Sequence, residues 1–206
     1  MAKLSGPLLS FGASGSLADS VTFTKRKRQH VAKAYAVPAN PNSSAQVSQR
    51  SIISAANSAI ASARTATSDP FDSDDISALT LLVRTLGKHS TWYNQAVSLF
   101  SLVESSGYTG CVIRNGTFYD SGGTWTFKFF SDEIDGVNLT SGRLYYGRSP
   151  SVLTLSSNCS FDPVFNVASA SMLGVLPGET WYVRFISDIG GNCFGASSGI
   201  YKTVVS

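Results

Sequence analysis

The side chains able to carry out acid–base or metal chemistry are few and lie far apart in the sequence. The two histidines are His30 and His89, and the three cysteines, Cys111, Cys159 and Cys193, include no Cys-x-x-Cys pair. A structural zinc site needs four closely spaced thiolate or imidazole ligands. We therefore expect no metal and no cofactor. The odd number of cysteines argues against a disulfide framework, so we expect single buried thiols in strands.

Aspartates gather in one short segment, at positions 69, 72, 74 and 75. A calcium loop of the EF-hand type would need a central glycine and a distal glutamate, and the segment has neither at the required spacing. Acids are favoured at the start of a helix, where they cap backbone N–H groups and face the positive end of the helix dipole. We interpret this segment as a helix cap. The acids in residues 132–135 are interpreted as turn residues, with a weak cation site as the alternative.

Signatures of nucleophilic or phosphate chemistry are missing from the sequence. There is no Gly-x-Ser-x-Gly elbow, and Gly12-Ala13-Ser14-Gly15 has the wrong spacing. There is no Gly-x-x-x-x-Gly-Lys-Ser/Thr loop. The sequence therefore predicts no catalytic residues, and we expect a protein that is not an enzyme.

Positive charge is concentrated near the N-terminus. The first 50 residues carry seven basic residues and one acid, a net charge of +6, whereas the whole chain has +3. The cluster can be a solvated turn, can contact an acidic protein neighbour or can bind nucleic acid. No aromatic residues interleave it, so nucleic acid is the least favoured partner. The candidates for this charged contact are Lys25, Arg26, Lys27, Arg28 and Lys33.

The elements before residue 40 are an extended arm and a hairpin. Residues 1–19 place a few apolar side chains among glycines and serines, which predicts an arm that must lie on another part of the protein or on a neighbour. Residues 20–36 alternate with period two around a polar tip at residues 25–29, which predicts a β-hairpin. The apolar residues expected to form an assembly interface are Leu8, Leu9, Phe11, Val21, Phe23 and Tyr35.

Three helices are predicted between residues 42 and 107. Apolar residues repeat every three or four positions from Ile52 to Ala63, from Ile76 to Leu86 and from Trp92 to Val103. Asp69-Pro70 should end the first helix, and Gly87 should interrupt the second. The helices should form a small bundle or a layer on the hairpin, so residues 20–107 are predicted to form one domain.

From residue 108 onward, short alternating segments separated by Gly, Asn, Asp and Pro predict an all-β sandwich over residues 108–206. Asn115-Gly116 is a type I′ hairpin signal between two of the strands. The fold class expected for the whole chain is therefore α+β, with an arm, a hairpin and a helical layer followed by the sandwich.

Composition limits the location of the protein. Hydrophobic residues make up 43% of the sequence, enough for a core, and no apolar run is long enough for a membrane-spanning helix. The first residues lack the apolar core of a signal peptide. We expect synthesis in a cytoplasm without export by a cleaved signal, and no membrane partner.

Residues from about 120 to 206 resemble a fibronectin type III domain. The match rests on Leu176, Pro177, Gly178 and Tyr182, and Trp125 stands where that family has a tryptophan in its second strand. The segments around residues 145–150 and 199–203 look like its third and last strands. The resemblance implies that Leu176 plugs the core, that the Pro-Gly pair makes a turn and that an aromatic residue packs at the corner.

The N-terminal part resembles uncharacterised proteins of tailed bacteriophages and prophages. The pattern is a hairpin, a Pro-x-Asn-Pro-x-(Ser/Thr)-x-x-Gln segment and an arginine that opens a helix. Residues 92–96 and 110–115 also look like that group. The matching residues are Pro38, Asn40, Pro41, Ser43, Gln46 and Arg50.

This second resemblance implies a structural protein of a virion, at the head surface, neck or tail. Its partners would be other virion proteins and copies of itself. The alternative hypothesis is a module that binds carbohydrate or a host surface. Under that hypothesis the stacking residues would be exposed aromatic side chains at Tyr145, Tyr146 and Trp181.

Overall fold

A computed structural model describes residues 42–87, 91–121, 124–131, 141–162, 167–188 and 193–205, together with four short strands before residue 35. The chain divides into two compact units, residues 1–43 and residues 44–206. The sequence predicted boundaries near residues 19 and 107 instead. The helices thus share a unit with the C-terminal strands, and the predicted hairpin belongs to the other unit.

The first unit contains one four-stranded antiparallel sheet in the order β1-β2-β3-β4. The strands are β1 (Lys3–Leu4), β2 (Ala13–Leu17), β3 (Val21–Arg26) and β4 (Gln29–Ala34). The predicted hairpin is confirmed, because β3 pairs with β4 from Val21↔Ala34 to Arg26↔Gln29. The predicted arm over residues 1–19 contributes strands β1 and β2, and β2 pairs with β3 of the hairpin. Glycine and serine give no alternating pattern, so these strands leave no signal in the sequence.

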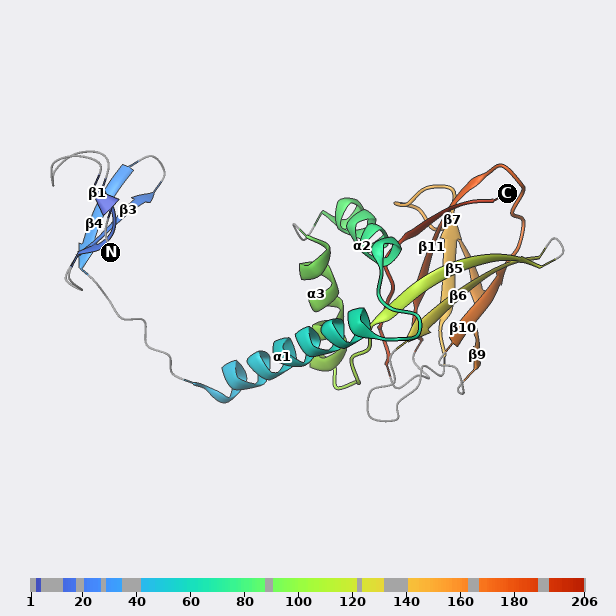
Figure 1. Cartoon of the computed structure of the whole chain (residues 1–206), viewed down its shortest axis with the longest axis horizontal. Helices are drawn as coiled ribbons and strands as arrows, with labels where there is room; N and C mark the ends of the chain where they lie inside the picture. Colours follow the sequence, from blue (N-terminus) through green and yellow to red (C-terminus); the bar gives the residue numbers. More distant parts are fainter. Residues whose placement is uncertain are drawn as a thin grey trace. The chain divides into compact units, whose positions relative to one another are not determined.

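Three helices begin the second unit: α1 (Ser44–Thr65), α2 (Ser73–Leu86) and α3 (Trp92–Ser105). Both α1 and α2 pack on α3, as Figure 1 shows. Most of their buried apolar residues form one cluster with Phe71, Val112 and Ile200, whereas Ala78 and Val103 belong to the core between the sheets. The three predicted helices are confirmed. Within the described residues, no helix is long and apolar enough to cross a membrane.

The predicted cap of the second helix is also confirmed. The side chain of Asp72 accepts hydrogen bonds from the N–H groups of Asp74 and Asp75, at 2.8 and 3.2 Å. Oδ2 of Asp75 accepts in return from the N–H of Asp72 at 3.1 Å. This reciprocal arrangement is a capping box. At the other end, Gly87 has φ +64°, the left-handed conformation in which glycine commonly ends a helix.

Two four-stranded antiparallel sheets complete the unit. One has the order β5-β6-β10-β9, and the other has the order β12-β11-β7-β8. The strands of the first are β5 (Ile113–Ser121), β6 (Thr124–Ser131), β9 (Ser160–Asp162) and β10 (Val167–Met172). Those of the second are β7 (Arg143–Gly147), β8 (Leu155–Asn158), β11 (Thr180–Ile186) and β12 (Tyr201–Val204).

The two sheets face each other across a shared aromatic core. Phe129 of β6 packs on Phe185 of β11 with ring centroids 5.4 Å apart, and on Tyr201 of β12 at 5.8 Å. Phe127 and Val183 are also fully buried in this core. Alternate residues of β6, β10 and β11 point into it, which is the burial pattern expected when one face of each sheet is covered. The predicted α+β fold class is confirmed.

Asn115-Gly116 is a β-bulge, so the predicted hairpin turn is wrong. β5 runs unbroken from Ile113 to Ser121, and its pairing with β6 shifts register between Arg114 and Thr117. Asn115 has φ +47°, the left-handed conformation that Asn-Gly favours in both turns and bulges. Asn-Gly therefore correctly indicated a left-handed backbone at this position, but the chain continues along β5 and does not reverse there.

Candidate assembly surface

Within the described residues of the unit 1–43, the structure shows one sheet and no second layer against it. Among the side chains described in this unit, Val21 and Thr22 are half-buried, and the five others, which include Ala32, Lys33 and Ala34, are exposed. A sheet must cover one face with another element to be stable, and a unit of this size rarely forms a sufficient core. Its outer strands, β1 and β4, each pair with only one strand of the sheet.

Only part of the predicted assembly interface falls on described residues. Val21 is half-buried in β3, and the backbone of Phe23 pairs with Gly15 and Ala32. The remaining predicted interface residues, Leu8, Leu9, Phe11 and Tyr35, lie outside the described residues.

The predicted basic tip is shorter than expected. Lys25 and Arg26 lie inside β3, paired with His30 and Gln29 of β4, so they belong to the strand. Lys33 is exposed in β4. The other two members of the cluster, Lys27 and Arg28, lie outside the described residues.

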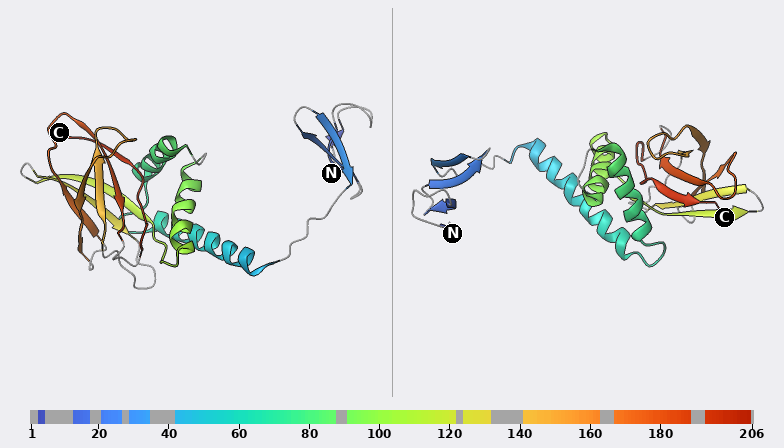
Figure 2. Two further views of the ribbon diagram at one scale, coloured as in Figure 1. Left: turned by 180° about the vertical axis from the view of Figure 1, so that it is seen from behind. Right: turned by 90° about the horizontal axis from the view of Figure 1, so that it is seen from above.

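The N-terminal half of α1 is a second uncovered surface. Every side chain from Ser44 to Ala55 is exposed except Ile52, which is half-buried. Burial starts at Ala56 and continues through Ile60 and Ala63. Figures 1 and 2 show these first turns extending beyond α2, α3 and the strands of their unit.

Apolar residues lie within this exposed stretch. Val47 is 51% exposed and Ile53 is 46% exposed. The sequence predicted Ile52 and Ile53 to continue the buried stripe, but the helix runs past its partners before that stripe ends. An isolated helix of about three turns is marginally stable in water. These turns therefore offer an apolar surface that a partner can cover.

A buried polar network joins the helical layer to the strands. Oδ1 of Asp75 in α2 accepts hydrogen bonds from the hydroxyl of Tyr201 and from the N–H of Asn115, the latter at 2.8 Å. The amide of Asn115 donates to Oδ1 of Asp69 at 2.7 Å, and Nε of Arg114 donates to the backbone oxygen of Asp69. The aspartate segment thus caps a helix and positions it against β5 and β12.

Burial sets the ionisation of this network. Desolvation raises the pKa of Asp75, although hydrogen bonds from Tyr201, Asn115 and Asp72 partly oppose the shift. Desolvation also raises the pKa of Tyr201, and the nearby Asp75 carboxylate adds to it. Desolvation lowers the pKa of Arg114. Asp75 and Tyr201, joined by a hydrogen bond, resemble an acid–base pair. Asp75 also accepts hydrogen bonds from the backbone of Asn115 and Asp72, so we assign the pair a structural role.

The described residues offer no metal site. They contain no group of three or more His, Cys, Asp or Glu side chains that could hold an ion. All three cysteines are free: Cys111 and Cys193 are buried and Cys159 is half-buried. Cys111 and Cys193 form a hydrogen-bonded pair, which the sequence did not predict.

The aromatic residues predicted for surface recognition are mostly inside the protein. Tyr146 is 2% exposed and Trp181 is 3% exposed, so their expected exposure is wrong. Their side chains point into the core because they occupy inward positions of β7 and β11. Tyr145, the neighbouring outward position of β7, is half-buried.

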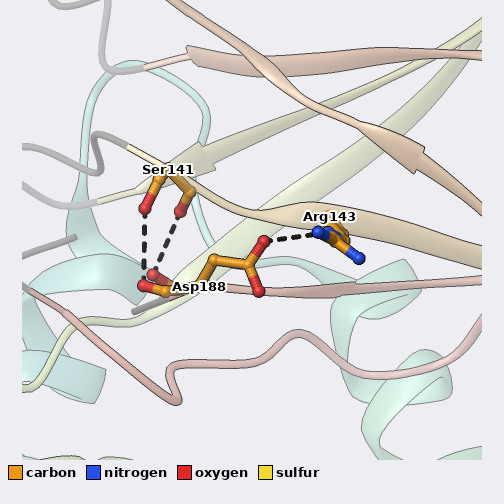
Figure 3. Close-up of polar contacts among 4 residues, drawn as sticks. Ser141, Arg143 and Asp188 are labelled. Atoms are coloured by element: carbon orange, nitrogen blue, oxygen red, sulfur yellow. Dashed lines mark hydrogen bonds and ion pairs between the residues drawn. The ribbon is translucent and has the colours of Figure 1, made fainter. Parts of the chain in front are cut away.

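An ion pair between Arg143 and Asp188 lies on the surface, at the start of β7. Nε of Arg143 lies 3.1 Å from Oδ2 of Asp188, and both side chains are about half exposed. Ser141 and Ser187 link the same two chain segments through side-chain hydrogen bonds to backbone oxygens (Figure 3). Exposed ion pairs contribute little to stability. This cluster ties the start of β7 to the end of β11 and offers no enclosed binding site.

Comparisons with models of protein families, with curated proteins and with solved structures found no match.

Proposed function

We propose that this protein is a structural component of a bacteriophage virion that assembles through its N-terminal part. The observation that carries the proposal is that none of the side chains described within residues 1–43 is buried. The exposed first turns of α1 add a second surface of the same kind directly after it in the chain. Both become stable when a neighbouring subunit covers them, through added strands or packed helices.

The virion assignment is supported by the order of the elements. The phage-like pattern needs a hairpin, then a Pro- and Asn-containing segment, then a helix. β3 and β4 form the hairpin, and α1 begins at Ser44, within the matching segment. One departure is that Arg50 lies inside α1, whereas the pattern has an arginine at the opening of the helix.

We further infer that strands β5 to β12 form a fibronectin type III-like or immunoglobulin-like module, which the particle would display. The sheet orders β5-β6-β10-β9 and β12-β11-β7-β8 support this inference, because two Greek-key sheets of this kind are typical of such sandwiches. Trp125 is buried in the second of these strands, as in that family.

The predicted core plug departs from the family pattern. Leu176 is 59% exposed, so the expectation that it fills the core is wrong. The neighbouring Val175 is buried in the core instead. Tyr182, expected at the corner, is half-buried and packs on the helical cluster. Tyr182 thus contacts the helices, whereas the resemblance implies that the corner aromatic residue packs within the sandwich.

Light scattering on the full chain and on a chain of residues 44–206 tests assembly. We expect a discrete multimer for the full chain and a folded monomer for residues 44–206, because the truncation follows the boundary between the two units. The same multimer for both chains would contradict assembly through residues 1–43. Mass spectrometry of purified phage particles tests the location, since a virion component must be present there in stoichiometric amounts.

A further inference from the structure

The outer face of the sheet β5-β6-β10-β9 carries a shallow cavity. The helices contact β5 and β12, and within the described residues they leave the outward residues of β6, β9 and β10 uncovered. The cavity has a volume of about 620 Å³, within the range of small-molecule sites. Its lining includes Tyr119, Lys128, Phe130, Ser160, Asp162 and Ser169.

Strand register arranges these side chains in rows across the sheet. Lys128 pairs with Thr117 on one side and Ser169 on the other, and Ser169 pairs with Ser160. This row therefore combines an ammonium group with hydroxyl groups.

The neighbouring row runs through Phe130, Val167 and Asp162, so it places an aromatic ring and an aliphatic side chain beside a carboxylate. Side chains that alternate along each strand point to the same face, so both rows face the cavity.

Tyr119 supplies a flat aromatic surface at the edge of these rows. Its ring is 46% exposed, which is unusual for an aromatic side chain in a strand of this protein. Nζ of Lys128 lies 4.7 Å from the centroid of the ring, a cation–π distance. The hydroxyl of Thr117 lies 3.4 Å from the tyrosine hydroxyl. The ring is thus oriented without being buried.

We propose that this face binds a neutral carbohydrate through stacking of a pyranose ring on Tyr119. A sugar ring has one apolar C–H face and a rim of hydroxyl groups that both donate and accept hydrogen bonds. The cavity matches this chemistry: an aromatic surface, a donor in Lys128, and the hydroxyls of Ser160 and Ser169, which both donate and accept.

The charges of this face argue against two other ligand classes. One ammonium group and one carboxylate share the cavity, so the site lacks the positive excess that a phosphate or nucleic acid needs. A stable protein interface would need a larger, fully desolvated apolar centre. The inference is independent of the assembly proposed for residues 1–43.

Saturation-transfer NMR on the full chain tests the site. The probes are the methyl glycosides of glucose, galactose and mannose and N-acetylglucosamine, each at millimolar concentration, with glucuronic acid and inorganic phosphate for comparison. We expect transfer to at least one neutral sugar, about tenfold weaker affinity for Tyr119→Ala and nearly full affinity for Tyr119→Phe. Tyr145→Ala, on the outer face of the other sheet, is the control and should bind like the wild type.

The outcomes decide the proposal. Transfer to a neutral sugar that Tyr119→Ala weakens and Tyr145→Ala does not would support it. No transfer to any neutral sugar, equal transfer in wild type and Tyr119→Ala, or binding of phosphate alone would overturn it. Thermal unfolding of each variant confirms that it is folded. If Tyr119→Ala is unfolded, Tyr119→Leu replaces it, since leucine keeps an apolar side chain in β5 but removes the flat ring, and it should bind about as weakly as expected for Tyr119→Ala.

Discussion

The hydroxyl of Tyr201 donates a hydrogen bond to the carboxylate of Asp75, which joins the last strand of the second sheet to the first turn of α2. Asp75 is 1% exposed and also accepts from the backbone of Asn115 and Asp72. The carboxylate of Asp75 therefore connects α2 to the bulge in β5 and to β12. A buried acceptor of this kind is expensive to leave without its donors.

Tyr201→Phe should destabilise the protein by about 1–3 kcal/mol, since it removes one donor from a buried carboxylate while keeping the ring in the core. Urea unfolding measures the change. Tyr145→Phe, at a half-buried outward position, is the matched control and should change stability by less than about 0.5 kcal/mol. Equal stability of the two variants would mean that the Tyr201 hydroxyl contributes nothing.

Asp75 should also make stability depend on pH. Burial raises its pKa in the folded protein above the ordinary 3.8. A carboxyl with a raised folded pKa binds its proton more tightly in the folded state, so its contribution favours folding at low pH. That contribution is lost as pH rises from the ordinary pKa through the raised one.

The test is the difference in free energy of unfolding between the wild type and Asp75→Asn, measured from roughly pH 3 to pH 7. Asparagine loses one of the acceptor oxygens, so the variant should be less stable at all these pH values. The wild-type advantage should shrink as pH rises. An advantage that grows with pH would show that the carboxylate form is the stabilised one.

The thiols should react slowly in the folded protein. Burial, with a smaller effect of Asp188, raises the pKa of Cys159 to about 12, so almost none of it is thiolate at neutral pH. A hydrogen bond that Cys111 donates to Cys193, together with burial, raises the pKa of Cys111 well above its usual value. The same hydrogen bond lowers the pKa of Cys193, but that side chain is 1% exposed, so a reagent cannot reach it in the folded protein. An aromatic disulfide reagent at neutral pH should therefore label the thiols only after denaturation, three per chain. Rapid labelling of the native protein that Cys159→Ser abolishes would contradict this.

The exposed apolar residues of α1 should matter for assembly and little for folding. Ile53→Asp removes apolar surface from the uncovered half of the helix, so it should shift the multimer to smaller species by light scattering without a large change in unfolding temperature. Leu102→Asp is the matched control, since Leu102 is also exposed but lies in α3. Equal loss of assembly in both variants would show a general solubility effect.

Close packing at Gly199 gives a further prediction. A Cβ atom there would lie 2.5 Å from the backbone carbon of Ala78 in α2. The helix backbone cannot yield easily, so Gly199→Ala should destabilise by about 1–3 kcal/mol or more. Gly174 has φ +74° and open space, so Gly174→Ala carries only backbone strain of about 1 kcal/mol. Thermal unfolding compares the two, and the reverse order would contradict the close contact.

The spacing of apolar residues predicted where helices and strands lie, but it did not predict which strands pair with one another. The apolar stripes located all three helices, and the aspartate segment located a cap, because both signals are local. Asn115-Gly116 showed a left-handed backbone, but a bulge and a hairpin turn share that requirement and differ only in which strand pairs next. β1 and β2 gave no signal, since glycine and serine do not alternate.

The candidate surfaces depended on information that no local pattern carries. Whether an aromatic residue in a strand points inward is set by register, and Tyr146 and Trp181 were assigned to the wrong face. Tyr119 was passed over, although the alternation of Phe118, Tyr119 and Asp120 allowed either face. The charge of Lys128, a diagonal neighbour of Tyr119 on β6, could have indicated the outer face.

The backbone just before β12 has a partner in the helical layer. The N–H of Ile200 donates to the backbone oxygen of Ala78, at 3.0 Å, beside the close contact at Gly199. α2 is synthesised long before this segment, so a nascent chain holds its helices without the surface that they dock on. We therefore expect the contact between α2 and this segment to form only after residues 199–205 leave the ribosome, as one of the last steps of folding.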